Sequence, residues 1–98
     1  MRVELSRFIE LDLDTIAEYI AQDSATRAVS FLKEIRTRIR EVGQGPLLYQ
    51  LRPEIGKDAR MALAGRYAIL FRIDGDVVRI ERVVYGGRDL GSLLDQER

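Results

Sequence analysis

A tight turn flanked by two alternating stretches is the feature that most constrains how this chain folds. Large apolar residues at 67, 69, 71 and 73 alternate with Ala68, Leu70 and Arg72, and after Asp74-Gly75-Asp76 a returning strand follows over residues 77–85. Glycine as the first of two central turn residues is typical of a β-hairpin. With Asp74 opposite Val77, one apolar face forms from Tyr67, Ile69, Phe71, Ile73, Val78, Ile80 and Val84. A one-residue slip would expose this whole set, so the register is well specified.

A third strand is expected over residues 59–64, ahead of the hairpin. A three-residue loop, Ala64-Gly65-Arg66, would place Met61 and Leu63 on the same apolar face as the hairpin. The same register places Arg60 on the opposite face of the sheet.

One charged residue interrupts the apolar face of the hairpin. The predicted register sets Arg82 beside Ile69 and turns it towards the core. A buried guanidinium needs an anionic partner, unless its stem carries it to the sheet edge. We therefore expect Arg82 to have a structural role, paired with Asp89 or with a carboxylate on a helix.

The N-terminal half predicts a short strand and then a helical hairpin. Val3 and Leu5 alternate with charged residues. Apolar residues then recur at helical spacing in two sets: Ile9, Leu13, Ile16, Ala17 and Ile20, and Ala28, Leu32, Ile35, Ile39 and Val42. Ser6 and Ser24 stand where residues that cap helix N-termini belong, and Gly43-Gln44-Gly45-Pro46 would end the second helix.

These elements predict a single α+β domain over residues 1–98. A short N-terminal strand and a helical hairpin would pack on one face of a twisted antiparallel sheet, in the order β-α-α-β-β-β. The loop over residues 43–57 is rich in apolar residues, so we expect it to lie against the body of the domain.

Composition excludes several classes of function. The 98 residues include no cysteine and no histidine, and the 16 basic and 16 acidic residues cancel. Thiolate chemistry and the commonest metal ligand are therefore missing, and we expect no metal and no cofactor. The acidic pairs Asp12/Asp14 and Asp74/Asp76 are explained by a helix start and a turn. No signal peptide or membrane span is recognisable, so the default location is the cytoplasm.

The predicted sheet presents a second, polar face that gathers guanidinium groups. Arg60, Arg72, Arg79 and Tyr85 share this face, Arg66 stands in the turn at its rim, and Arg88 follows the last strand. Such a face suits a phosphate backbone, stacked bases or an acidic segment of a partner. The alternative is an ordinary polar face, in which Arg72 and Arg79 pair weakly with Glu81.

Three segments together resemble the RelE/ParE superfamily of toxins from type II toxin–antitoxin systems. In order along the chain they read DLDTIAEYIAQDSATRAVSFLKEI, LRPEIGKDAR and GRYAILFRIDGDVVRIERVVYGGRDL. The segment from Arg66-Tyr67 to Gly87-Arg88-Asp89-Leu90 is the most specific part. The resemblance implies a bacterial toxin held by a cognate antitoxin, with operator DNA contacted only through the antitoxin.

The superfamily includes two activities, and this sequence is closer to the ParE branch. RelE-like members cleave ribosome-bound messenger RNA without a metal, whereas ParE-like members inhibit DNA gyrase. Here Ala68 stands where a RelE-type nuclease usually has an arginine, and Leu93, Leu94 and Asp95 follow Arg88 in place of tyrosine or histidine. The leading expectation is a gyrase inhibitor that acts by binding. The alternatives are a messenger RNA endonuclease and a weakened toxin that mainly binds its antitoxin.

The target and the antitoxin would each need a surface. Residues that could contact the target are Arg60, Arg66, Arg72, Arg79, Tyr85 and Arg88. Residues that could anchor the antitoxin are Tyr19 and Phe31, taken as exposed helix positions, and Leu47, Leu48 and Tyr49 in the loop. For any one of these apolar residues, plain core packing is the alternative.

Overall fold

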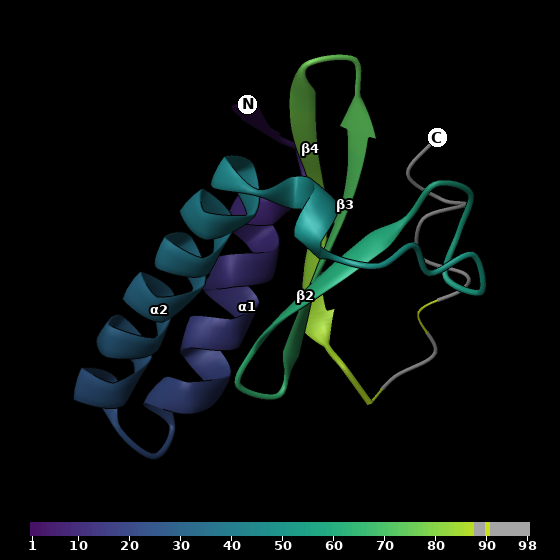
Figure 1. Cartoon of the computed structure of the whole chain (residues 1–98). Helices are drawn as coiled ribbons and strands as arrows, with labels where there is room; N and C mark the ends of the chain where they lie inside the picture. The colour runs from purple at the N-terminus through teal and green to yellow at the C-terminus, as the bar shows by residue number, and fades with distance from the viewer. Residues whose placement is uncertain (88–89, 91–98) are drawn as a thin grey trace.

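The fold was determined as a computed structural model, which describes residues 1–87 and 90. It consists of a short strand, two helices, a 3-10 turn and three further strands (Figure 1). These are β1 (Arg2–Leu5), α1 (Ile9–Ala21), α2 (Ala25–Gln44), η1 (Pro46–Leu48), β2 (Arg60–Ala64), β3 (Tyr67–Asp74) and β4 (Val77–Tyr85). The predicted α+β class and the order of elements are confirmed.

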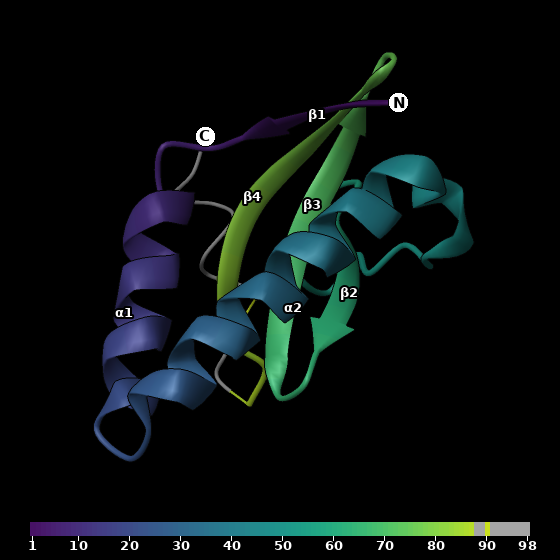
Figure 2. The same ribbon diagram turned by 90° about the vertical axis from the view of Figure 1, so that its left-hand side faces the viewer.

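The four strands form one mixed sheet in the order β1-β4-β3-β2. β2, β3 and β4 are antiparallel neighbours, as predicted, but β1 pairs with β4 in parallel. The sheet is therefore not wholly antiparallel. The reason is the helical hairpin, which returns the chain to the end from which it started, so that β1 and β4 run the same way (Figure 2).

The second helix continues through Gly43, although the sequence predicted that it would end at Gly43-Gln44-Gly45-Pro46. Gly43 lies where α2 meets β1. A Cβ atom on Gly43 would lie 2.4 Å from the Cγ2 atom of Val3, so a larger residue would push the strand away. The amino group of Met1 donates a hydrogen bond to the Gly43 carbonyl, at 3.1 Å. The helix ends only at Gln44, and Gly45 follows it as the cap.

The two helix starts differ in how they are capped. Ser24 caps α2 as predicted, since its hydroxyl accepts a hydrogen bond from the Arg27 amide at 3.1 Å. The prediction for Ser6 is wrong, because α1 begins at Ile9 after a turn and its cap residue is Phe8. The Ser6 hydroxyl instead donates to the Glu81 carbonyl at 2.6 Å and ties the chain to β4.

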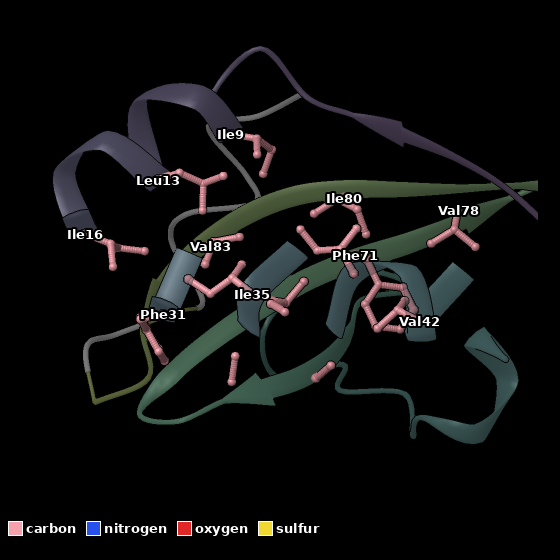
Figure 3. Packing of buried hydrophobic residues seen from close by; sticks show 14 residues of the cluster. Ile9, Leu13, Ile16, Phe31, Ile35, Val42, Phe71, Val78, Ile80 and Val83 are labelled. Carbon is pink, nitrogen blue, oxygen red and sulfur yellow. The ribbon is translucent and has the colours of Figure 1, made fainter. Parts of the chain in front are cut away.

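The main core lies between the helical hairpin and one face of the sheet (Figure 3). Both helices contribute most of their predicted stripes, and the sheet contributes Ile69, Phe71, Val78 and Ile80. Phe31 is also in this core and is only 4% exposed, so its interpretation as an exposed helix position is wrong. Its ring lies beneath Gly65, where any Cβ atom would approach it to 3.2 Å.

The hairpin between β3 and β4 has the predicted turn but a shifted register beyond it. Gly75 has a positive φ of 60°, and Asp74 faces Val77 as expected. A bulge then lies between Phe71, opposite Ile80, and Leu70, opposite Arg82. One extra residue on β4 reverses the faces that follow it.

The bulge corrects the predicted faces at the end of β4. Ile69 stands opposite Val83 and not opposite Arg82. Arg82 stands opposite Leu70 of the far-face cluster, so the expectation that it turns towards the main core is wrong. Val83, and not Val84, joins the main core, while Val84 packs on the other side of the sheet.

The register of β2 also differs from the prediction, because the connecting turn is shorter by one residue. Ala64 pairs with Tyr67, so Gly65 and Arg66 alone make the turn. Ala62 and Ala64 therefore face the helices, and Met61 and Leu63 point to the opposite side. Arg60 has the same parity as Ala62, so its predicted place on the far face is wrong.

The loop between η1 and β2 covers part of the far face of the sheet (Figure 1). A second cluster forms there from Ile55, Ala59, Ala68, Leu70 and Val84, with Met61 and Leu90 beside it. The expected packing of the loop is confirmed for this part. It is wrong for Leu47, Leu48 and Leu51, which are exposed.

Candidate functional site

The open edge of β4 is closed by a carboxylate from the first helix. β1 ends at Leu5 opposite Ile80, so the remainder of β4 has no strand on that side. Asp12 accepts a hydrogen bond from the Val83 amide at 3.0 Å there. An edge amide that would otherwise lack a partner is thereby satisfied.

The same carboxylate holds Arg82 in a two-pronged ion pair. The Nε and Nη2 atoms of Arg82 lie 2.8 and 2.9 Å from the two oxygens of Asp12. The guanidinium also lies over the ring of Phe8, 5.1 Å from its centroid. The prediction that Arg82 pairs with a helix carboxylate is confirmed. The alternative partner, Asp89, lies outside the described residues.

Beside this ion pair, α1 and the ends of β3 and β4 enclose a groove of about 680 Å³. The helix side is lined by Leu11, Asp12, Thr15, Ile16, Tyr19 and Ile20. The sheet side is lined by Arg66, Tyr67, Arg82, Val83, Val84 and Tyr85. The groove is mostly apolar, and its one helix carboxylate is already paired with Arg82.

Three of the chain's four tyrosines meet in this groove. The rings of Tyr67 and Tyr85 pack edge to face, with centroids 6.0 Å apart, and Tyr19 projects from α1. Burial raises the pKa of Tyr67, and the neighbouring Tyr19 and Tyr85 add to the rise. The Tyr67 phenol therefore stays neutral at physiological pH and offers a hydroxyl donor beside aromatic faces.

Arg66 supplies the positive charge at the rim of the groove. It occupies the second position of the turn between β2 and β3, after Gly65 with its positive φ of 56°. It is exposed, and it makes no ion pair with any residue in the described part of the chain. Its guanidinium is thus available to a carboxylate or a phosphate from outside.

The predicted cationic face is arranged differently. Arg72 and Arg79 are neighbours across β3 and β4 on the far face, as expected. The buried carboxylate of Glu81 lies between them, 3.5 Å from Arg72 and 3.6 Å from Arg79. Arg72 also donates to the Lys57 carbonyl at 2.8 Å, under the covering loop. Much of this charge is therefore neutralised within the protein.

The other target-contact candidates are scattered over the molecule. Arg60 donates a hydrogen bond to the carbonyl of Tyr49 and is only partly exposed. Tyr85 lies on the helix side of the sheet, because the bulge reverses its predicted face. Arg88 lies outside the described residues. The structure brings Arg66 and Tyr85 together in one groove and separates them from Arg72 and Arg79.

The residues predicted to anchor the antitoxin also lie apart from one another in the structure. Tyr19 is 67% exposed and lines the groove. Leu47 and Leu48 project from η1, whereas Tyr49 packs its ring edge against Phe71. Tyr19 is the member of this set that reaches the groove.

Sequence reasoning identified Tyr19, Arg66 and Tyr85 among the groove residues and missed the rest of the lining, including Asp12 and Tyr67. Asp12 belongs to the acidic pair that the sequence assigns to a helix start, where burial is not expected. A signal was present, since a buried Arg82 requires an acid, and Asp12 precedes the buried Leu13 directly. Tyr67 was assigned to the core, and its partly buried ring does pack against it.

The comparisons with known proteins agree with this geometry. Residues 3–90 match the family model of the ParE toxin of the type II toxin–antitoxin system, parDE. The chain belongs to this family. A solved structure described as a chromosomal ParDE TA system from P. aeruginosa is also similar, with a TM-score of 0.76. It is 20% identical over 87% of this chain and 95% of that chain, so it demonstrates a shared fold. No curated protein matches the sequence significantly.

The match to the ParE toxin family includes every residue that lines the groove. Among residues 1–87 and 90, no cluster of acidic side chains could hold a metal ion. Neither helix is long and apolar enough to cross a membrane.

Proposed function

We propose that this chain is the toxin of a two-protein system, that it arrests growth by binding DNA gyrase, and that a cognate antitoxin neutralises it. The observation that carries the proposal is the match of residues 3–90 to the ParE toxin family. Both partners would be met in the cytoplasm, where gyrase acts.

The chemistry of the groove supports inhibition by binding. A general base works best when its pKa lies near the operating pH. The sequence holds no histidine and no cysteine, and burial moves the pKa of Tyr67 further from neutrality. Arginine stabilises phosphate charge but is a poor base. The residues of the groove are thus suited to holding a partner.

The arrangement of the far-face arginines points the same way. Cleavage of RNA without a metal needs several cations that converge on one phosphate. Arg72 and Arg79 are instead held by Glu81, and Arg60 by a backbone carbonyl. This arrangement does not favour the alternative of a ribosome-dependent endonuclease.

A supercoiling assay tests the proposal directly. Purified chain is added to DNA gyrase and relaxed plasmid, and the expected result is a dose-dependent loss of supercoiling. The control is the same chain premixed with the protein encoded by the adjacent reading frame, which should restore supercoiling. Normal supercoiling at large molar excess, together with codon-phased cleavage of transcripts after induction, would overturn the proposal. An unaffected growth rate after induction would indicate a weakened toxin.

A further inference from the structure

We infer that the outer edge of β1 is an interface for a second copy of this chain, in which the two β1 strands pair antiparallel about a two-fold axis at Val3. Two four-stranded sheets would then form one continuous sheet. The inference goes beyond the proposed function and does not depend on it, because neither gyrase nor an antitoxin takes part.

The two outer edges of the sheet differ in how they are covered. At the β2 edge, Leu51 forms a bridge with Arg60, and the Nε atom of Arg38 donates to the Leu63 carbonyl at 3.0 Å. At the β1 edge, no strand among residues 1–87 and 90 lies on the outer side, and β1 runs along the margin of the molecule (Figure 2). An uncovered edge offers its backbone groups to another strand.

The backbone groups on this edge are those of Val3 and Leu5. Successive residues of a strand direct their amide and carbonyl groups to opposite edges. The Ser6 amide donates to the Ile80 carbonyl of β4 at 2.9 Å. By this alternation Glu4 also faces β4, whereas Val3 and Leu5 face outward. Two amides and two carbonyls are thus presented to a partner strand.

The charges of β1 favour a second copy as the partner and select its register. With Val3 opposite Val3 of the second copy, Arg2 of each chain lies opposite Glu4 of the other. Opposite charges directly across an antiparallel pair stabilise it, and two-fold symmetry forms this pair twice. A shift to the next register that pairs outward-facing residues would place Glu4 opposite Glu4, and like charges there are destabilising.

The exposed apolar residues at the edge fit the same register. Met1 is 54% exposed and Leu5 is 45% exposed, and the pairing places Met1 of one copy opposite Leu5 of the other. Leu5 also lines a cavity of about 260 Å³ between β1 and the helices, together with the buried Ile9 and Ile39. The flexible side chain of methionine fills irregular apolar spaces well. Met1 of the second copy would therefore cover this cavity.

The small size of the interface determines how tightly the two copies associate. The strand is only four residues long, Arg2–Leu5. Stable complexes typically bury about 1,600 Å² in total, and smaller interfaces belong to weak, transient complexes. We therefore expect a dissociation constant on the order of 100 μM. Association should depend on concentration and be reversed by dilution.

The test is sedimentation equilibrium of the full chain, from about tenfold below to about tenfold above that concentration. The average mass of the wild-type chain should rise towards twice that of the monomer. Arg2→Glu and Glu4→Arg should each raise the dissociation constant by about tenfold or more, because each change makes two attractive pairs repulsive. Lys33→Glu, the same kind of charge reversal on the exposed side of α2, should change it by less than about twofold. Since all three positions are exposed, thermal unfolding should match wild type.

Mixing the two charge-reversed chains tests the register itself. The Arg2→Glu chain carries two acids on β1 and the Glu4→Arg chain carries two bases, so each repels its own copy. An equimolar mixture should form a heterodimer about as tightly as wild type forms its homodimer. The double variant Arg2→Glu/Glu4→Arg should regain the homodimer. Hydrogen exchange of the Val3 and Leu5 amides should slow as the wild-type concentration rises, whereas exchange of the Glu4 amide, which faces β4, should not change.

Several outcomes would overturn the inference. A wild-type chain that stays monomeric at the highest concentration excludes the interface. A dimer that survives both single reversals unchanged does not use the β1 edge. If the mixed variants fail to associate, Arg2 and Glu4 do not lie opposite each other and the register is wrong. If Tyr19→Ala weakens the dimer while the β1 variants do not, the aromatic groove is the interface. All of these measurements use the chain alone, so failure of the proposed function would appear separately, in the supercoiling assay.

Discussion

The far face of the sheet and the groove beside α1 differ in how their arginines are paired with carboxylates. On the far face, Arg72 and Arg79 flank the buried Glu81, and a loop lies over the apolar residues beside them. At the open edge of β4 beside α1, Arg82 is paired with Asp12, while Arg66 stays exposed at the rim of an aromatic groove. The two neighbouring arginines of the far face thus offer less free charge than the single exposed Arg66 at the rim of the groove. The number of cations on a surface is a poorer guide to binding than the number left without a carboxylate.

Among the changes that test this comparison, loss of the Asp12 carboxylate should lower the free energy of unfolding the most. Asp12→Ala removes the carboxylate that pairs with the largely buried Arg82 guanidinium and accepts a hydrogen bond from the Val83 amide. Removing one member of a buried ion pair costs about 3–5 kcal/mol, so the free energy of unfolding should fall by about that amount. Urea unfolding measures it. The neighbouring exposed Asp14→Ala should stay within about 0.5 kcal/mol. Equal effects would mean that α1 is not anchored through Asp12.

Truncation of a far-face side chain tests whether that face is really covered. Leu70 is fully buried beside Ile55 on this side of the sheet. Leu70→Ala should cost about 2–4 kcal/mol in urea unfolding, as it would in a main core. Leu63→Ala, on the same face of β2 but 52% exposed, is the comparison and should cost well under half as much. If Leu70→Ala costs less than about 1 kcal/mol, the face is open and could bind a partner.

Removal of the acid between the far-face arginines should have a smaller effect. Glu81→Gln keeps the shape but leaves Arg72 and Arg79 opposite each other without the negative charge. We expect a loss of about 1–2 kcal/mol in the free energy of unfolding, since a hydrogen-bonded charge is removed from a buried position. Arg79→Ala should cost less than about 1 kcal/mol, because Arg79 is half exposed. Glu81→Gln should also increase binding of inorganic phosphate to this face. No change in either measurement would show that Glu81 does not neutralise the face.

The smallest effect concerns the groove at high pH. The folded pKa of Tyr67 is raised, mainly by burial, while the unfolded chain titrates near the ordinary value of 10.0. The neutral phenol therefore contributes stability that is present below that value and is lost as pH rises through the folded pKa. In a pH titration followed by phenolate absorbance, part of the signal should appear above the ordinary tyrosine pKa, and Tyr67→Phe should remove that part. The Tyr67→Phe chain should also lose less stability than wild type in alkali. A titration that the substitution leaves unchanged would mean that the ring is fully solvated.

Much of the fold could be predicted because local patterns specify it. The two helical stripes, the Ser24 cap and the turn at Gly75 depend on residues close together in the chain, and each was confirmed. The candidate site was harder to predict from the sequence. The predicted face depended on the length of the Gly65-Arg66 turn and on a regular β4. An error of one residue in each placed Arg60 and Tyr85 on the wrong side.

By itself, the amino-acid sequence determined the α+β class, the amphipathic hairpin, the resemblance to the ParE toxins and the absence of thiol and imidazole chemistry. Tertiary structure decided the parallel pairing of β1, the bulge before Arg82 and the choice of Asp12 as its partner. The physical reason is that successive side chains of a strand point to opposite faces. One inserted residue therefore reverses the face of every residue that follows it. Whether an arginine is free or neutralised depends in turn on acids up to 70 positions away along the chain.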